Sequence, residues 1–133
     1  MIVLDTHALV WWVNGGDHLS PNAKSAIDDA CSARDGLLLV SAISAWEIAM
    51  LVKAGRLILT MAVDDWLETV SAIECVRLVP VDHVVGVEST RLPGEFHKDP
   101  ADRMIVALAR HLNVPLVTAD EKIRAYRHVQ TLW

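Results

Sequence analysis

Short hydrophobic runs alternate with amphipathic segments along the whole chain. Each run is rich in Val, Ile and Leu and is too short for a helix, so it predicts a buried strand. The predicted strands are residues 1–5, 36–41, 76–81, 115–120 and 129–133. Apolar residues in the segments between them recur at helical spacing. The predicted helices are residues 6–14, 19–33, 44–55, 64–74, 82–90, 99–113 and 121–126.

Capping residues mark the ends of several of these helices. Ser20 is a favourable N-cap, and Pro21 suits the first helical position. Asp99 and Pro100 repeat this arrangement at the start of the clearest helix in the chain. Gly55 stands where the helix at residues 44–55 would stop.

Strands that alternate with helices are typical of βαβ units, in which helices cover both faces of a mostly parallel sheet. The sequence therefore predicts the α/β class, as a three-layer α/β/α fold with four or five strands. A doubly wound sheet of order 3-2-1-4-5 would place strands one and four side by side. The chain has 133 residues and no repeat or linker, which predicts a single domain over residues 1–133.

Composition excludes several classes of protein. The chain is 53% hydrophobic and 22% charged, which favours a folded globule over a disordered or repeat protein. Its net charge of -5 lacks the basic surplus typical of nucleic-acid-binding proteins. From residue 86 onward, however, the chain has seven basic and six acidic residues. A local basic surface in this part of the chain is therefore still compatible with the sequence.

Cys31 and Cys75 are far apart and fit no zinc-binding or redox motif, so we expect two reduced, buried thiols. The chain has no recognisable signal peptide, and no apolar run approaches the ~18 residues of a membrane span. These features predict a cytoplasmic protein.

Acidic residues fall where an open α/β sheet places functional groups, beyond the carboxyl ends of its strands. Asp5 ends the first predicted strand and Asp120 ends the fourth. Glu47 lies one turn into the helix after the second strand, and Asp102 lies in the first turn of the helix before the fourth. With strands one and four adjacent, all four carboxylates would converge.

Such convergence requires cations. Two like unit charges about 4 Å apart repel by about 4 kcal/mol at an effective dielectric of about 20. All-oxygen ligation favours Mg²⁺ or Mn²⁺ over zinc. One or two such ions activate a water and stabilise the leaving oxygen in a phosphodiester displacement, which is nuclease chemistry.

Each acidic residue also has a structural explanation. Asp5 and Asp120 could each cap the helix that follows. Asp99 is favoured as an N-cap, and Asp102 at the third helical position would suit the helix dipole. Glu47 has Trp46 and Ile48 as neighbours, which suggests a mostly buried segment where a lone carboxylate needs a partner.

Four segments together resemble the VapC toxins, which are PIN-domain proteins of bacterial and archaeal type II toxin-antitoxin systems. The segments are MIVLDTHALVWW, VSAISAWEIAMLVKAGRL, HKDPADRMIVALA and LVTADEKIRAY, and the resemblance runs from residue 2 to Trp133. It implies a PIN-like fold and a metal-dependent endoribonuclease that uses Mg²⁺ or Mn²⁺.

The resemblance also implies roles for individual residues. Thr118 is expected to orient a carboxylate or the attacking water. Asp99 is carried over only as a candidate outer ligand of the metal. The metal ligands of the family match Asp5, Glu47, Asp102 and Asp120.

Partners follow from the same resemblance. It implies an RNA substrate, a homodimer, and a small VapB-like antitoxin that lies in a groove and blocks the acidic site. A large exposed aromatic side chain would suggest such a surface, and the candidates are Trp11, Trp12, Trp46 and Trp66. In the predicted helix at residues 44–55, Trp46, Ala49 and Met50 form one apolar stripe.

Other residues near the acidic motifs are candidates for contacts with substrate. His7 and His97 flank the acidic residues and are expected on the substrate side or behind the ligands, because no third His falls at zinc-ligand spacing. The candidates for contacting RNA are Thr6, Arg91, Lys98 and Arg103.

Three other functions compete. A PIN-domain nuclease could process RNA without being a toxin. A receiver-like signalling domain has a similar acidic pocket but needs an acidic pair after the first strand, where this chain has Asp5 followed by Thr6. A binding module with an inactive site is disfavoured, because the full acidic set is present.

Overall fold

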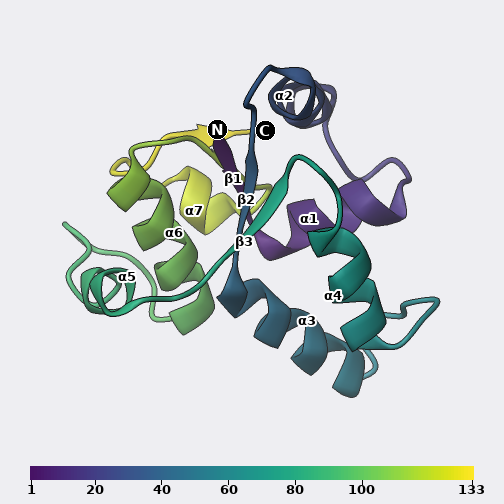
Figure 1. Ribbon diagram of the computed structural model, residues 1–133. Coiled ribbons are helices and arrows are strands. Elements are labelled where there is room, and N and C mark those ends of the chain that lie inside the picture. Colours follow the sequence, from purple (N-terminus) through teal and green to yellow (C-terminus); the bar gives the residue numbers. More distant parts are fainter.

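Five short strands form one sheet in the order β3-β2-β1-β4-β5, and every neighbouring pair is parallel (Figure 1). This is a computed structural model that describes all residues, Met1–Trp133. The strands are β1 (Ile2–Leu4), β2 (Leu38–Ser41), β3 (Val76–Val79), β4 (Leu116–Val117) and β5 (Thr131–Leu132). The predicted α/β class and strand order are confirmed.

Helices fill the connections between the strands. They are α1 (Thr6–Asn14), α2 (Pro21–Ser32), α3 (Ala42–Lys53), α4 (Val63–Ser71), α5 (His83–Glu88), α6 (Pro100–Leu112) and α7 (Glu121–Arg124). The predicted helices match these positions, whereas the strands are shorter than predicted. Asp5 and Asp120 explain part of the difference, because each already caps the next helix and lies outside the ladder.

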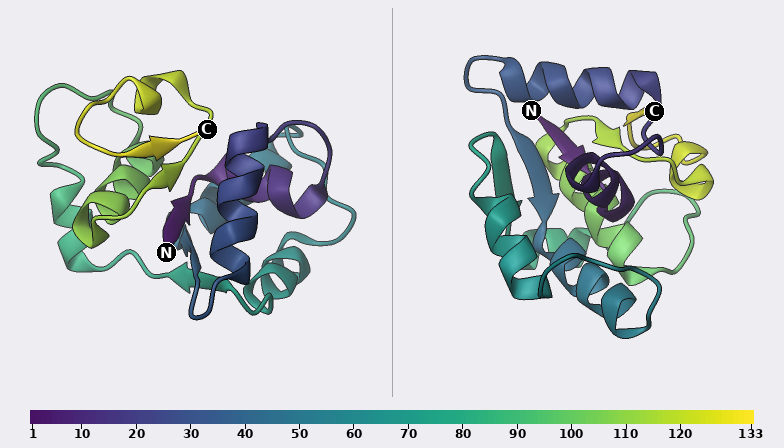
Figure 2. Two further views of the ribbon diagram at one scale, coloured as in Figure 1. Left: turned by 90° about the horizontal axis from the view of Figure 1, so that it is seen from above. Right: turned by 90° about the vertical axis from the view of Figure 1, so that its right-hand side faces the viewer.

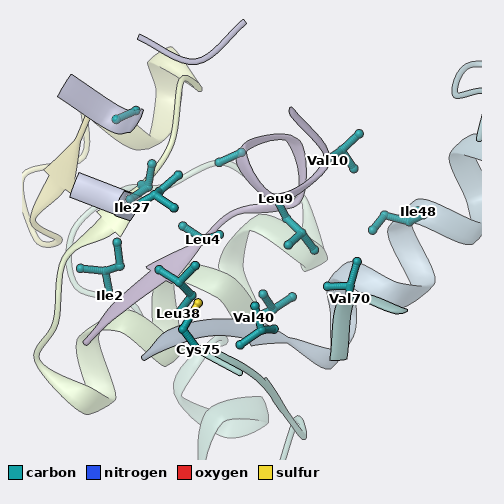
Figure 3. Packing of buried hydrophobic residues seen from close by; sticks show 14 of the residues in the cluster. Ile2, Leu4, Leu9, Val10, Ile27, Leu38, Val40, Ile48, Val70 and Cys75 are labelled. Carbon is teal, nitrogen blue, oxygen red and sulfur yellow. The ribbon is translucent and has the colours of Figure 1, made fainter. Parts of the chain in front are cut away.

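Side chains alternate between the two faces of the sheet, as expected for buried strands. Ile2 and Leu4 pack into a cluster with apolar residues of α1 to α4 (Figure 3). Val3, between them, points to the other face and packs against α5, α6 and α7. The two ribbon views of Figure 2 show helices on both sides of the sheet. The predicted three-layer arrangement is therefore confirmed.

Helices α1, α3, α6 and α7 begin at the carboxyl edge of the sheet. Helices α1, α3 and α7 each follow a strand there, and α6 starts at the same edge because it leads back to the beginning of β4. Ser41, Asp5, Asp99 and Asp120 are the N-caps of these four helices. The fold thus gathers capping side chains, three of them carboxylates, on one edge.

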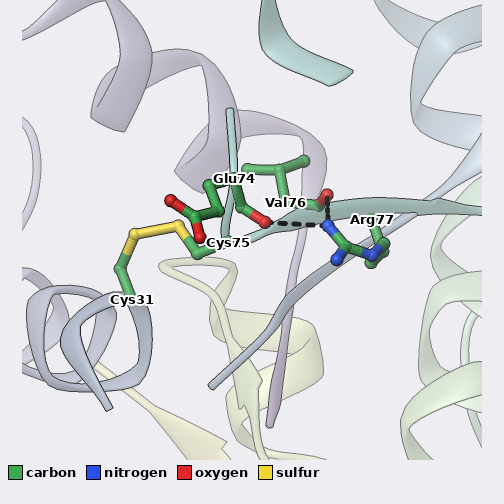
Figure 4. The surroundings of a disulfide bond; sticks show 5 residues. All are labelled: Cys31, Glu74, Cys75, Val76 and Arg77. Carbon is green, nitrogen blue, oxygen red and sulfur yellow. Dashed lines mark hydrogen bonds between the residues drawn. A yellow bond between two sulfur atoms is a disulfide. The ribbon is translucent and has the colours of Figure 1, made fainter. Parts of the chain in front are cut away.

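A disulfide joins Cys31 to Cys75, which contradicts the prediction of two reduced thiols (Figure 4). Cys31 lies near the end of α2, just before β2, and Cys75 directly precedes β3. Because β2 and β3 pair in parallel, both cysteines reach the amino edge of the sheet, where Leu38 N–H donates to the Cys75 carbonyl. Their Cα atoms are 5.2 Å apart, within the usual range for a disulfide.

The prediction of a cytoplasmic protein rests partly on the expectation that both thiols are reduced. The disulfide removes that ground. None of the helices combines the length and the apolar character that a membrane span requires.

Helix α3 buries a different face from the one that its sequence suggested. Ser44 and Ile48 are its buried residues, whereas Trp46 is 55% exposed and Met50 is 47% exposed. The expectation of a mostly buried segment around Glu47 is therefore wrong. Ser44 and Ile48 are four positions apart and lie on the buried side of α3, so the stripe with Trp46 faces outward.

Candidate metal centre

Asp5 is placed by the end of β1 and the start of α1. Its N–H donates to the Val117 carbonyl of β4, which fixes the backbone beside the neighbouring strand. Its Oδ1 accepts a hydrogen bond from Ala8 N–H at 2.8 Å, and the residue is buried. One carboxylate oxygen therefore caps α1, and the other has no part in that cap.

Asp120 repeats this arrangement at the end of β4. Its Oδ1 accepts hydrogen bonds from the N–H groups of Lys122 and Ile123, which caps α7. Its own N–H donates to the Thr118 hydroxyl oxygen at 3.0 Å. Thr118 is fully buried and also forms a hydrogen bond with Asp5. This threonine thus links the two strand-end aspartates, and its orienting role stays a prediction.

Glu47 reaches the same region from α3. The Thr6 hydroxyl donates a hydrogen bond to Glu47 Oε1, and the hydroxyls of Thr6 and Ser44 are hydrogen-bonded at 2.8 Å. Thr6 and Ser44 are both buried. The partner that we expected for Glu47 is therefore a threonine of α1. Ser44 was missed by sequence reasoning, although its place one turn before Glu47 on α3 is the signal that could have identified it.

Asp99 and Asp102 stand one turn apart at the start of α6. Asp99 Oδ1 accepts a hydrogen bond from Asp102 N–H at 2.9 Å, which confirms Asp99 as the N-cap. Carboxylate oxygens of Glu47, Asp99 and Asp102 all lie within 4.8 Å of one another. Asp99 is therefore both a cap and close enough to act as the outer ligand suggested by its motif.

The four predicted metal ligands line one pocket of about 340 Å³. Its other lining residues are Thr6, His7, Trp11 and Ala119. The pocket brings Asp5, Glu47, Asp102 and Asp120 together, although only Glu47 and Asp102 also belong to the tight group with Asp99. Glu47 and Asp102 therefore belong both to the tight group and to the pocket, and Asp5 and Asp120 line the same pocket.

Burial and mutual repulsion raise the pKa values of two carboxyls. Burial raises the pKa of Asp5 from its ordinary 3.8, and hydrogen bonds from Thr118 and Ala8 partly oppose the rise. Burial raises the pKa of Asp102 to about 7, and repulsion from the surrounding carboxylates adds to the effect. Those carboxylates are Asp99, Asp120, Glu47 and Asp5, in order of decreasing effect. The pocket therefore disfavours ionisation of both carboxyls when no cation is bound.

This donor set fits a hard divalent cation. All the ligating atoms in the pocket are carboxylate or hydroxyl oxygens except the His7 ring, and both cysteines are joined at the opposite edge of the sheet. Oxygen donors without thiolates are typical of Mg²⁺ and Mn²⁺ sites. A cation would neutralise the repulsion that raises the pKa of Asp102.

His97 lies against the acidic group from the segment before α6. Its Nε2 is 3.1 Å from Asp102 Oδ2, but this contact does not have the geometry of a hydrogen bond and the nitrogen has no other partner. His7 lines the pocket from the first turn of α1. The two histidines therefore flank the carboxylates, as the sequence suggested.

The basic candidates for RNA contacts divide into two groups. Arg91 and Lys98 are exposed. The Arg103 side chain instead donates hydrogen bonds to three backbone carbonyls, those of Ser89, Phe96 and His97. Arg103 therefore holds the segment before α6 in place, and its contact with RNA phosphate stays a prediction. Thr6 is likewise engaged, through its bonds to Glu47 and Ser44.

Comparison with known proteins finds relatives in one family. The PIN domain family profile matches residues 2–129. Ribonuclease VapC22 of Mycobacterium tuberculosis is 37% identical over 134 residues, which cover 99% of this chain and 98% of that protein.

Solved structures are similar in fold. VapBC2 from Rickettsia felis, crystallised with a fragment of promoter DNA, has a TM-score of 0.67 at 14% identity, covering 98% of this chain and 97% of that one. VapC20 of Mycobacterium tuberculosis, described as a toxin that cleaves the sarcin-ricin loop, has a TM-score of 0.64 at 15% identity, covering 98% and 99%.

Proposed function

The chain belongs to the PIN-domain family, and from this membership we propose that it is a VapC-type endoribonuclease, the toxin of a type II toxin-antitoxin system. The observation that carries the proposal is the pocket in which Asp5, Glu47, Asp102 and Asp120 meet. A full-length relative, 37% identical, is named as a ribonuclease, which supports RNA as the substrate.

The four carboxylates would hold Mg²⁺ or Mn²⁺ in this pocket. When bound, such an ion acts as a Lewis acid at a phosphodiester and supplies a nucleophile at neutral pH. Thr118 forms hydrogen bonds with Asp5 and with the backbone N–H of Asp120, and Thr6 forms one with Glu47 that orients its carboxylate. These hydroxyls fix the carboxylates before a cation arrives, which lowers the cost of assembling the site.

Substrate would approach over the rim of the pocket. Arg91 and Lys98 are exposed on the segments leading to α6 and are proposed to contact RNA phosphates. Thr6 is proposed to act through Glu47, because its hydroxyl is buried. Asp99 is proposed to contribute its second oxygen as an outer ligand of the cation.

We further propose that the protein forms a homodimer and binds a small VapB-like antitoxin. Several of the similar solved structures are described as toxin-antitoxin complexes, which supports an antitoxin partner. The outward stripe of α3 offers exposed apolar surface directly beside Glu47, at Trp46 and Met50. An antitoxin that covers this stripe would lie next to the acidic pocket and could block it.

Cleavage of RNA by the purified protein tests the proposed activity. Cleavage should require Mg²⁺ or Mn²⁺, stop in EDTA, and be lost in Asp5→Asn. Asp28→Asn is the matched control, because Asp28 is exposed on α2, away from the pocket. Cleavage that survives both EDTA and Asp5→Asn would refute the proposal.

A further inference from the structure

A second hollow adjoins the acidic pocket. It has a volume of about 550 Å³, within the roughly 300–1,000 Å³ typical of sites for small ligands. We call it the basic cleft, and its walls include Gly94, Phe96, His97, Lys122, Arg127 and His128. None of these residues is a proposed metal ligand, although His97 also lies against Asp102.

The lining of the basic cleft carries a small positive surplus. Lys122 and Arg127 are both exposed on its walls, and Glu95 is the acidic residue among its lining groups. His97 and His128 add two imidazoles that can donate hydrogen bonds. A chain with a net charge of -5 thus places a local positive surplus beside its most acidic pocket.

Aromatic rings form a continuous row along the same cleft. The ring centroids of His97 and Phe96 are 4.5 Å apart, those of Phe96 and Tyr126 are 4.7 Å apart, and those of Tyr126 and His128 are 5.3 Å apart. Tyr126 is buried, whereas Phe96, His97 and His128 are partly exposed. The row therefore offers flat ring surfaces next to cationic side chains.

The basic cleft and the acidic pocket share their dividing wall. His97 lines the cleft, and its Nε2 lies 3.1 Å from Asp102 Oδ2. Lys122 lines the cleft with its side chain, while its N–H donates to Asp120 Oδ1. A polymer bound at the carboxylates can therefore extend into the cleft, because only one or two side chains separate the two.

The walls of the cleft are fixed by hydrogen bonds from other elements. Arg110 of α6 donates to the His128 carbonyl, and the Tyr126 hydroxyl donates to the Pro93 carbonyl. Gly94 has a φ of +66°, and a Cβ there would lie 3.4 Å from His128 Nε2. Glycine therefore permits the backbone turn at this wall.

We propose that the basic cleft is a subsite for a nucleotide adjoining the scissile phosphate of the RNA substrate. Lys122 and Arg127 each contact a phosphate of the RNA backbone, and the base stacks on the rings of Phe96, His97 and His128. Cationic groups interleaved with aromatic rings are the combination that binds single-stranded nucleic acid. An acidic peptide would use the cations but leave the ring surfaces without a partner. This inference rests on the proposed ribonuclease activity.

RNA binding by charge-removal variants tests the subsite. Lys122→Ala/Arg127→Ala is made in an Asp5→Asn background, so that the probe is not consumed, and is compared with Lys24→Ala/Arg34→Ala in the same background. Lys24 and Arg34 are exposed on or just after α2, away from the cleft. The probe is a short fluorescein-labelled single-stranded RNA of mixed sequence, and anisotropy is measured across a salt series.

The cleft variant should bind RNA about tenfold more weakly and should lower the slope of log K against log salt by about 1.4, since each phosphate contact contributes about 0.7 on a single strand. The control should change neither value. Equal affinity and equal slope in the cleft variant and the control would overturn the subsite. Because all four replaced side chains are exposed, loss of folding does not account for a difference, and circular dichroism verifies this.

Cleavage kinetics, measured in protein that keeps the native Asp5, separate this inference from the proposed function. Lys122→Ala/Arg127→Ala should raise KM about tenfold with kcat unchanged, because the lost contacts bind substrate and transition state equally. Wild-type cleavage with an unchanged KM in the variant refutes the subsite and leaves the nuclease intact. Absence of cleavage by the wild type refutes the nuclease, and absence of RNA binding in both backgrounds refutes the subsite as well.

Discussion

Asp5, Asp99 and Asp120 each begin a helix with one carboxylate oxygen and keep the other for the site. In each case Oδ1 accepts the capping hydrogen bonds from backbone N–H groups. A carboxylate has two oxygens, so capping and metal binding do not compete. The two alternatives that the sequence left open for these residues are therefore compatible.

Asp99 and Asp102 should respond differently to substitution. Asp99→Ala removes the cap of α6 and should lower the free energy of unfolding by about 0.5–2 kcal/mol. Asp102→Asn keeps the shape of the side chain, leaves the cap intact and should abolish cleavage. Urea denaturation and an RNA cleavage assay measure the two effects, with Asp99→Asn as the control that preserves a capping oxygen. Unchanged stability together with lost activity in Asp99→Ala would reverse the two roles.

The raised pKa of Asp102 predicts how the stability of the metal-free protein depends on pH. The pKa of this carboxyl is about 7 in the folded chain and near 3.8 when unperturbed, so the folded state binds the extra proton between these values. The free energy of unfolding should therefore fall as the pH rises through this window. Asp102→Asn should flatten the fall, and saturating Mg²⁺ should reverse it by binding the ionised carboxylate. Denaturation curves at several pH values check this, and identical profiles for wild type and variant would contradict it.

Residue roles were predictable where a motif fixed them locally and not where a distant partner decided them. Asp99 was identifiable as a cap because its partner, the Asp102 N–H, is three positions away. The hydrogen bonds of Arg103 were not predictable, because its acceptors include the Ser89 carbonyl, which only the folded chain brings near. From the sequence, Arg103 was a candidate for contacting RNA only because it stands beside acidic residues.

Helix α6 is anchored to the segment before it by Arg103. The guanidinium donates to the carbonyls of Ser89, Phe96 and His97, and so sets the backbone that carries His97 toward Asp102. An arginine provides several donors in a rigid fork, which a lysine cannot reproduce. The same anchor therefore shapes the wall between the acidic pocket and the basic cleft.

Arg103→Gln should lower the free energy of unfolding by about 1–3 kcal/mol, since it leaves buried carbonyls without a charged donor. It should also weaken RNA cleavage, because His97 and the dividing wall lose their support. Arg91→Gln, at an exposed arginine of the same connection, should be nearly neutral for stability. Equal stability of the two variants in urea denaturation would contradict the anchoring role.

The limits and the buried face of a helix were predictable from sequence where the helix is apolar on one side only. Helix α6 has a continuous buried face and a strong cap, and its predicted limits match. Helix α3 is apolar on both sides, so its sequence could not tell which face meets the sheet. The structure buries Ser44 and Ile48 and leaves Trp46 exposed.

At the scale of the whole molecule, the disulfide and the acidic pocket occupy opposite edges of the sheet. Cys31 and Cys75 lie at the amino edge, whereas the carboxylates lie beyond the carboxyl ends of the strands. The pairing was not predictable from sequence, because 44 positions separate the cysteines and only the parallel pairing of β2 with β3 brings them together.

Loss of the disulfide should lower stability without disturbing the metal centre. Cys31→Ser/Cys75→Ser should reduce the free energy of unfolding by about 2–4 kcal/mol, because the unfolded chain regains the freedom of a long closed loop. Affinity for Mn²⁺ and RNA cleavage at a temperature where both proteins are folded should be unchanged. Denaturation in the presence and absence of a reductant is the direct comparison, and wild type should respond to reductant while the double variant does not. A loss of metal affinity in the double variant would show that the two edges are coupled.

The central position of β1 sets the order in which the site can form. This strand pairs with β2 on one side, but its other neighbour, β4, is more than a hundred positions further along the chain. Contacts so distant in sequence form late in folding. A nascent chain that has not yet reached β4 therefore carries Asp5 and Glu47 without Asp120. We expect a growing polypeptide on the ribosome to be inactive until its last strands pair, which separates synthesis of the nuclease from its activity.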